Sequence, residues 1–143
     1  MATYPLPKFH FQVEWGGKRI GFTEVTGLDK QTEVIEYREG NSLEYHKLKM
    51  PGMQKFSNIT LKRGTITGDS DFYVWMSATN LTIAERRDIT ISLLDEKHKA
   101  VMAWKAKNSF PVKVQASDLK SDGNEVAIET LELAHEGLEF MNI

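Results

Sequence analysis

The sequence predicts a mainly antiparallel β-barrel or β-sandwich with one short helix. Apolar and polar residues alternate with a period of two in successive short segments, and glycine or proline separates most of these segments. Only one stretch repeats apolar residues at helical spacing. A chain of 143 residues is long enough for one hydrophobic core and short for two. We therefore expect a single domain over residues 1–143 that contains about seven to nine strands.

The first strand is predicted from four apolar residues that alternate with polar ones, at Phe9, Phe11, Val13 and Trp15. This period places the four side chains on one face, where they pack on a core. Gly16 and Gly17 favour the positive φ angles of a tight turn. We therefore expect an opening hairpin with a second strand over residues 19–25, followed by a third strand over residues 33–38.

The alternation weakens after the third strand, and Pro51 and Gly52 interrupt any strand ladder that would pass through them. We interpret residues 39–56 as a long loop or extended arm. Connections of this length are uncommon in compact domains and usually have a function. The alternation resumes in a strand over residues 58–64.

One short helix is predicted over residues 69–79, because Asp69 or Ser70 suits its N-cap. The residues that recur at helical spacing are Phe72, Trp75, Met76 and Thr79. A second capping signature, at Thr82 and Glu85, is followed at once by strand alternation, and we favour the strand there.

Further strands are predicted over residues 88–93, 101–107, 111–116 and 125–133. Pro111 stands at the start of its strand, where a missing N–H group is tolerated. The last segment changes phase between Thr130 and Leu131, which indicates a bulge or a strand that is covered on both faces.

The composition excludes several classes of function. Lys and Arg number 18 against 20 Asp and Glu, so there is no basic excess for binding a nucleic-acid backbone. The absence of cysteine excludes disulfides, thiolate metal sites and cysteine nucleophiles. No apolar stretch has the length of a signal peptide core or of a spanning helix. We therefore expect a soluble protein that is made in the cytosol and does not insert into a membrane.

The sequence also lacks the known catalytic motifs. Neither a G-x-S-x-G elbow, a phosphate-binding loop nor an H-E-x-x-H motif occurs. The four histidines stand without the close spacing that brings two imidazoles to one metal, at His10, His46, His98 and His135. We predict no catalytic residue, no metal site and no cofactor.

Two pairs of acidic residues, Glu33 with Glu36 and Glu129 with Glu132, invite comparison with glycosidases. Residues three apart in a strand lie on opposite faces, so we interpret them as solvated or interface charges. The tryptophans fit core packing better than a stacking platform, at Trp15, Trp75 and Trp104. A small ligand-binding or hydrolytic β-barrel that uses these residues is the least favoured alternative.

Seven sequence blocks follow one another along the chain. They cover residues 24–28, 36–40, 51–52, 58–64, 88–91, 107–113 and 124–138. In this order the blocks resemble those of the T4-like tail tube proteins, a family that includes the inner tube proteins of phage-derived extracellular contractile injection systems. The resemblance extends from about Phe9 to Leu138.

The resemblance implies a small β-barrel of two packed sheets with a flanking helix and no catalytic activity. Six copies would close into a ring, and rings would stack into a hollow tube inside a contractile sheath. Residues 39–56 would be the arm that reaches a neighbouring subunit and the adjacent ring, while strand edges at residues 58–64 and 125–135 would join subunits. The implied subunit and ring-stacking interface comprises Tyr45, Leu48, Met50, Met53, Phe56, Leu61, Arg63, Val126, Ile128, Leu131 and Leu133.

By the same analogy, the partners would be further copies of the chain, the sheath, the baseplate, the tube-terminating protein and a cargo in the lumen. The protein would be made in the bacterial cytoplasm and incorporated into a phage tail or an extracellular injection particle. A specialised tube-initiator or terminal ring protein of the same particle stays open as an alternative.

Overall fold

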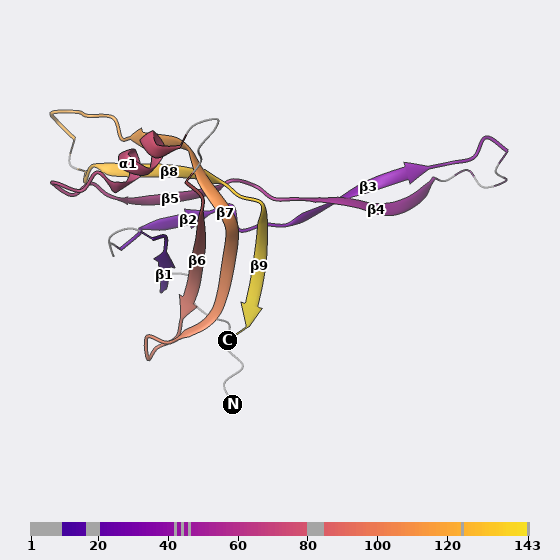
Figure 1. Cartoon of the computed structure of the whole chain (residues 1–143), viewed down its shortest axis with the longest axis horizontal. Coiled ribbons are helices and arrows are strands. Elements are labelled where there is room, and N and C mark those ends of the chain that lie inside the picture. Colours follow the sequence, from indigo (N-terminus) through magenta and orange to yellow (C-terminus); the bar gives the residue numbers. More distant parts are fainter. Residues whose placement is uncertain are drawn as a thin grey trace.

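Nine strands and one helix make up the described part of the chain, so the mainly β prediction is confirmed (Figure 1). The computed structural model describes residues 10–16, 21–41, 43, 45, 47–79, 85–123 and 125–142. The strands are β1 (Phe11–Glu14), β2 (Glu24–Thr26), β3 (Gln31–Tyr37), β4 (Leu48–Lys55), β5 (Ile59–Gly64), β6 (Arg87–Leu94), β7 (Ala100–Ala116), β8 (Ile128–Ala134) and β9 (Gly137–Asn142), and the helix is α1 (Asp71–Ala78). Phe9 and the capping residue Thr82 lie outside the described residues.

Strand β7 belongs to two sheets. Its first half pairs with β6 and β9, and β1 pairs with the far edge of β6; we call these strands the β6 sheet. Its second half pairs with β8, which continues through β5 to β2; we call these strands the β5 sheet. All pairings are antiparallel. The prediction of two packed sheets is thus confirmed, but they do not close into a barrel, because β1 and β2 end the strand order without pairing with each other.

The opening hairpin predicted from Gly16 and Gly17 is wrong. Strand β1 pairs with β6 and β2 pairs with β5, so the two strands lie at opposite ends of the strand order. Gly16 does adopt the expected positive φ of 80°. A turn signal is local, however, and the partner of each strand is decided by where its apolar face is buried. Val13, for example, lies opposite Ile91 of β6.

The sequence predicted that Pro111 begins a separate strand, but this residue lies inside the 17-residue β7. The pairing with β6 ends at Ser109, and residues 110–116 pair only with β8 among the described strands. A proline is tolerated here because that half of β7 has one edge without a strand partner. Asn108, at a φ of 52°, and a register shift after Pro111 mark the place where β7 passes from one sheet to the other.

The core lies between the two sheets and is covered by α1. Its central aliphatic side chains, fully or almost fully buried, are Ile59, Leu61, Ile89, Ile91, Leu131 and Leu133. The predicted helix is confirmed over residues 71–78, with Phe72 and Trp75 turned inward. Trp15 meets Phe72 edge to face at 5.0 Å, and the Trp75 indole donates a hydrogen bond of 2.8 Å to the Glu85 carbonyl. Core packing of Trp15 and Trp75 is therefore confirmed.

The phase change predicted in the last segment has a different cause from a bulge in β8. Glu129, Leu131 and Leu133 all point inward, in regular alternation, and β8 keeps an unbroken register with β5. The apparent change arises because one core-facing position holds a glutamate. Buried carboxylates require a partner, and Arg63 of β5 supplies it.

Arg63 is the centre of a buried ionic cluster. Its Nε donates to Glu129 at 3.1 Å and its Nη2 donates to Asp69 at 3.3 Å, while its guanidinium carbon lies 3.7 Å from the centre of the Phe72 ring. All three charged side chains are almost completely buried. Removing three charged side chains from water is costly, so the intact cluster contributes little net stability. The loss of one member, however, leaves a buried charge without a partner, which is strongly destabilising. The cluster ties the segment before α1 to β5 and β8.

Replacing Arg63 with leucine is expected to lower the free energy of unfolding by about 3–5 kcal/mol, because Asp69 and Glu129 would remain buried without a counter-ion. The matched control is Lys62→Leu on the same strand, which removes an exposed pair with Glu24 and is expected to cost about 0–1 kcal/mol. Urea unfolding of both variants measures the difference. Equal losses in the two variants would contradict the proposed role of the cluster.

Candidate assembly surfaces

Strands β3 and β4 form a two-stranded hairpin that projects from the body as an arm (Figure 1). The sequence predicted a long loop or extended arm over residues 39–56, and residues 48–55 of that range form strand β4 of the hairpin. Pro51 lies within β4 opposite Val34. Because each strand of the hairpin has only one partner, Pro51 removes no hydrogen bond from a second neighbour.

One face of the arm is an apolar strip. Ile35 lies opposite Met50 and Tyr37 lies opposite Leu48, so these four side chains share a face. The register shift between Thr32 and Val34 sets Gly52 and Met53 together opposite Glu33. This bulge brings Met53 to the same face, and Gly52 makes room there, because a Cβ on it would lie 3.1 Å from the Ile35 side chain. We define the strip as Ile35, Tyr37, Leu48, Met50 and Met53.

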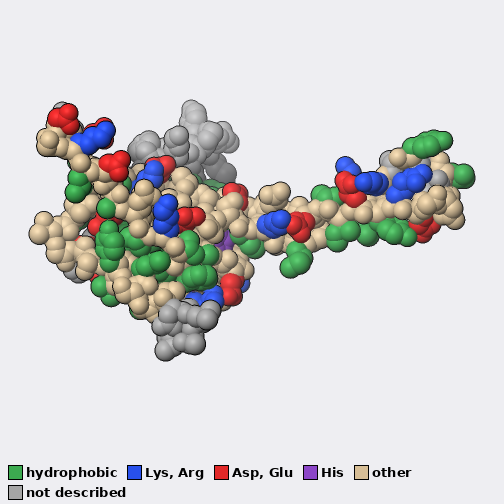
Figure 2. Space-filling view, turned by 90° about the horizontal axis from the view of Figure 1, so that it is seen from above, with side chains coloured by type: hydrophobic (Ala, Val, Ile, Leu, Met, Phe, Trp, Pro, Cys, Tyr) green, Lys and Arg blue, Asp and Glu red, His purple; other side chains and the backbone are tan. Residues whose placement is uncertain are grey.

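The strip is exposed, from 46% at Met50 to 79% at Met53. Figure 2 shows hydrophobic side chains along one long side of the arm, whereas the charged side chains gather mainly on the other. Lys47 pairs with Glu36 at 3.4 Å, and Lys55 pairs with Glu33. A contiguous exposed apolar surface that is bordered by charges is typical of an interaction site.

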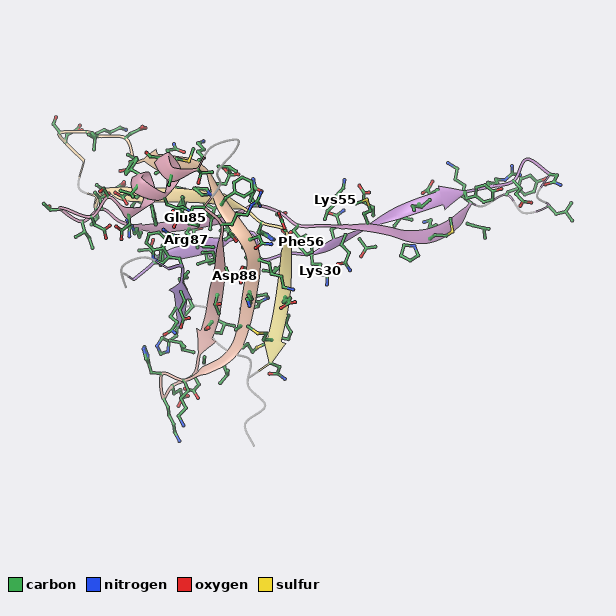
Figure 3. The ribbon with its side chains drawn as sticks, viewed as in Figure 1. Lys30, Lys55, Phe56, Glu85, Arg87 and Asp88 are labelled. Carbon is green, nitrogen blue, oxygen red and sulfur yellow. The ribbon has the colours of Figure 1, made fainter. Side chains whose placement is uncertain are left out.

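The base of the arm is fixed to the body where Lys30, Lys55 and Phe56 are labelled in Figure 3. Phe56 packs against the core, and its ring lies 5.5 Å from that of His135. The His135 Nε2 hydrogen-bonds the Ser57 carbonyl at 3.0 Å, and the Ser57 amide donates to Asp29 at 3.2 Å. These contacts set the direction in which the arm leaves the body.

The predicted interface residues divide into two groups. Tyr45, at the tip, is 97% exposed, Leu48, Met50 and Met53 belong to the strip, and Phe56 lies at the base. Val126 is exposed in the loop before β8, and Ile128, half-buried, begins β8. The others lie in the core of the single chain, namely Leu61, Arg63, Leu131 and Leu133.

The predicted joining edges at residues 58–64 and 125–135 do not fit the sheet order. Strand β5 lies between β2 and β8, and β8 lies between β5 and β7. Among the described strands, those with a single partner are β1, β2 and β9 in the body and β3 and β4 in the arm. The sequence could not distinguish these edges from internal strands, because apolar alternation reports a buried face and not a free edge.

The outer face of the β6 sheet is polar. Lys105 of β7 lies 3.6 Å from Asp88 of β6, and Lys107 pairs with Glu139 of β9. The backbone N–H of Asn108 donates a hydrogen bond of 3.0 Å to the Asp88 carboxylate. This bond lowers the pKa of Asp88, and the positive charge of Lys105 is a smaller cause of the same shift. A hydrogen bond from Lys107 likewise lowers the pKa of Glu139. This face is therefore a solvated lattice of opposite charges.

The structure brings together two histidines that the sequence analysis kept apart. His10 lies just before β1, and His98 lies in the turn between β6 and β7. The Nε2 of His10 is 2.9 Å from the Nδ1 of His98. His98 has a positive φ of 64°. Within the described residues no group of three or more His, Asp or Glu side chains is placed to hold a metal ion, and no helix is long and apolar enough to span a membrane.

Comparison with known proteins identifies relatives of this architecture. The sequence model of the T4-like virus tail tube protein gp19 matches residues 7–139. The chain of an anti-feeding prophage tube-terminating cap is 31% identical, with a TM-score of 0.90 over 100% of this chain and 95% of that one. A chain of the PVC sheath–tube complex, an extracellular contractile injection system, is 31% identical, with a TM-score of 0.89 over 99% and 94%.

Hcp1 from Flavobacterium johnsoniae shares the fold at 13% identity, with a TM-score of 0.62 over 94% of this chain and 96% of that one. No curated protein matches the sequence.

Asp88→Asn is expected to lower the free energy of unfolding at pH 7 and to have no effect in strong acid. Because the folded state lowers the pKa of Asp88 from its ordinary value of 3.8, the stabilisation is complete above that value and is lost as the pH falls through the lower folded pKa. Urea unfolding of both chains between pH 7 and pH 2 tests this, with Asp118→Asn in an exposed loop as the control. A loss that does not change with pH would contradict the assignment.

Proposed function

The chain belongs to the T4-like tail tube protein family, and we propose that it is a structural subunit of the inner tube of a contractile, phage-tail-like injection particle. The observation that carries the proposal is the combination of open strand edges and an exposed apolar arm. Both occur in a chain whose sequence is 31% identical to that of a chain from a sheath–tube complex. Such surfaces are liabilities in a monomer and are removed when identical copies assemble.

Ring closure uses the β6 sheet in this proposal. Its two edge strands, β1 and β9, each have one partner among the described strands. The alternating directions of β1, β6, β7 and β9 make β9 run opposite to β1. The β9 edge of one copy therefore meets the β1 edge of the next copy in antiparallel orientation when the copies are related by a rotation. This contact is head-to-tail and closes a ring without leaving a free edge.

Stacking of rings uses the arm. A buried apolar side chain contributes about 1.5–3 kcal/mol, whereas an exposed ion pair contributes about 0–1 kcal/mol. The apolar strip, rather than the lysines beside it, is therefore expected to supply most of the affinity between copies. We propose rings of six copies, as the family resemblance implies.

The proposal assigns the chain a structural and not a catalytic role. Its partners are the contractile sheath, the baseplate and the tube-terminating protein, and a cargo occupies the lumen. The chain is made in the bacterial cytoplasm before it enters the particle. The solved relatives that support these partners are chains from a sheath–tube complex and from a tube-terminating cap of such particles.

A terminal or initiator ring protein of the same particle is the second candidate. The observation in its favour is the similarity to a chain of the tube-terminating cap, with a TM-score of 0.90 and full coverage of this chain. The similarity to the sheath–tube chain is equally high, at 0.89. The two roles differ in what the protein builds, since a tube subunit polymerises and a terminal subunit stops at a ring.

Electron microscopy of the concentrated, purified protein tests the function. Extended hollow tubes are expected of the main tube subunit, and isolated rings of a terminal protein. A folded protein that stays monomeric by sedimentation, even with its sheath and baseplate proteins present, would overturn both roles.

Met50→Asp or Met53→Asp is expected to leave the monomer folded and to block stacking, because a carboxylate would be desolvated within the apolar strip. Gln54→Asp is the matched control, since it adds the same charge to the same strand, opposite Thr32 and outside the strip. Circular dichroism reports the fold, and sedimentation reports assembly. Tubes of normal length from either strip variant would contradict the role of the arm.

A further inference from the structure

We propose that His10 and His98 form a binding site for one divalent transition-metal ion, with Cu²⁺ and Ni²⁺ as the ions that fit best. The two imidazoles are its protein ligands, and water fills the other positions around the ion. The site goes beyond the proposed function, because a single copy carries both ligands. The sequence predicted no metal site, since the two histidines stand 88 residues apart along the chain.

The two rings already lie at the separation of neighbouring ligands on one ion. The Nε2 of His10 and the Nδ1 of His98 are 2.9 Å apart, and the ring centres are 4.9 Å apart. Two nitrogens that are each about 2.0–2.1 Å from a metal lie about 2.9 Å apart when their bonds meet at a right angle, and about 3.3 Å apart at the tetrahedral angle. The observed distance therefore fits the square geometry of Cu²⁺ and Ni²⁺ better than the tetrahedral geometry of Zn²⁺.

The contact between the rings can be exchanged for a metal ion without a change of charge on either ring. In a neutral pair, one of the two facing nitrogens carries a proton and the other accepts it. When each ring carries its proton on its other nitrogen, two lone pairs face the same gap. The ion then takes the place of the shared proton. The hydrogen bond thus holds the rings near the positions that the ion requires.

Both ligands stand on ordered backbone. The turn that carries His98 is held by the Asp95 carboxylate, which accepts two backbone N–H groups of the same turn, each at 2.9 Å. The His98 N–H donates to the Asp95 carbonyl at 3.0 Å. The His10 carbonyl accepts a hydrogen bond of 2.9 Å from the Leu94 N–H, at the end of β6. Little backbone freedom is therefore lost when an ion binds.

His98 holds a backbone conformation that glycine adopts more easily. Its φ of 64° lies in the left-handed region, where the Cβ of other residues is crowded. Strain of this kind is concentrated at functional positions. The side chain of His98 is exposed and does not belong to the core. Its imidazole is therefore better explained by what it binds than by packing.

The charges of the turn suit a cation that prefers nitrogen ligands. Asp95 and Glu96 balance Lys97 and Lys99, so the turn does not repel a cation by net charge. Over the part of the chain that the structure describes, no third His, Asp or Glu joins the pair as a metal ligand. Mg²⁺ and Ca²⁺ take several oxygen ligands, and we expect neither to bind here.

A bound ion links β1 to the far end of the β6 sheet. Strand β1 has only four residues, and its one partner among the described strands is β6. His10 lies directly before β1, and His98 lies in the turn that follows β6, at the end of this sheet away from α1 (Figure 1). Because the fold alone brings the two ligands together, the ion binds the folded chain and raises its Tm by mass action.

Titration of the untagged native chain with CuCl₂ or NiCl₂ at neutral pH tests the site. The chain has no cysteine, so thiolates do not compete for the ion. Isothermal titration calorimetry is expected to show saturable binding of one ion per chain. Circular dichroism is expected to show a rise in Tm with either salt and none with MgCl₂. Electron paramagnetic resonance of the Cu²⁺ form is expected to show two coupled nitrogens.

His10→Gln and His98→Asn each remove one ligand, and both are expected to lose the saturable binding and the rise in Tm. Asparagine tolerates the left-handed conformation, and His98→Gly replaces it if that chain does not fold. Glu96→Gln, in the same turn, and His46→Asn, outside the pair, are the controls and are expected to bind as the native chain does. Unchanged binding in either ligand variant, an equal rise in Tm with Mg²⁺, or no saturable binding by the native chain would overturn the site.

Discussion

The sharing of β7 between two sheets is the constraint on which the rest of the structure depends. Because the first half of β7 pairs with β6 and β9 and the second half with β8, the two sheets must lie one against the other, and the core forms between them. The same arrangement leaves β1, β2 and β9 with one partner each among the described strands. The strand that builds the core therefore also determines which strand edges stay without a partner in the single chain.

Stability and assembly are separated between the body and the arm. In the body, a buried arginine with two carboxylates fixes the segment before α1 against β5 and β8. A group of this kind adds little net stability but penalises any arrangement that separates its members. The arm has no such interior, and its apolar side chains face solvent. The body thus has a hydrophobic core within the single chain, whereas the arm leaves its apolar strip exposed.

Sequence reasoning predicted the fold class, the helix and most strands, because alternation and capping are local signals. It failed wherever the outcome depended on a distant partner. The core-facing position of Glu129 was not recognised, because a buried glutamate is expected only where a counter-ion is present and its counter-ion, Arg63, lies on another strand. The sequence predicted that Pro51 interrupts a strand and that Pro111 begins one, but each lies inside a strand at a place where one strand edge is free. The family resemblance located the arm, yet it could not separate the exposed strip from the buried Leu61, Leu131 and Leu133.

In the proposed assembly, the geometry of the arm couples its order to the presence of a neighbour. A two-stranded hairpin without a third strand or a packed layer is marginally stable in water. The bulge at Gly52 and Met53 aligns five apolar side chains on one face, so that a single docking event can bury all of them. In the proposed assembly, this hydrophobic gain is realised when a neighbour covers the strip, and it offsets the entropy cost of ordering the arm. In the proposed assembly, the strip and the open edges of one copy contact different neighbours, because they lie on different parts of the molecule.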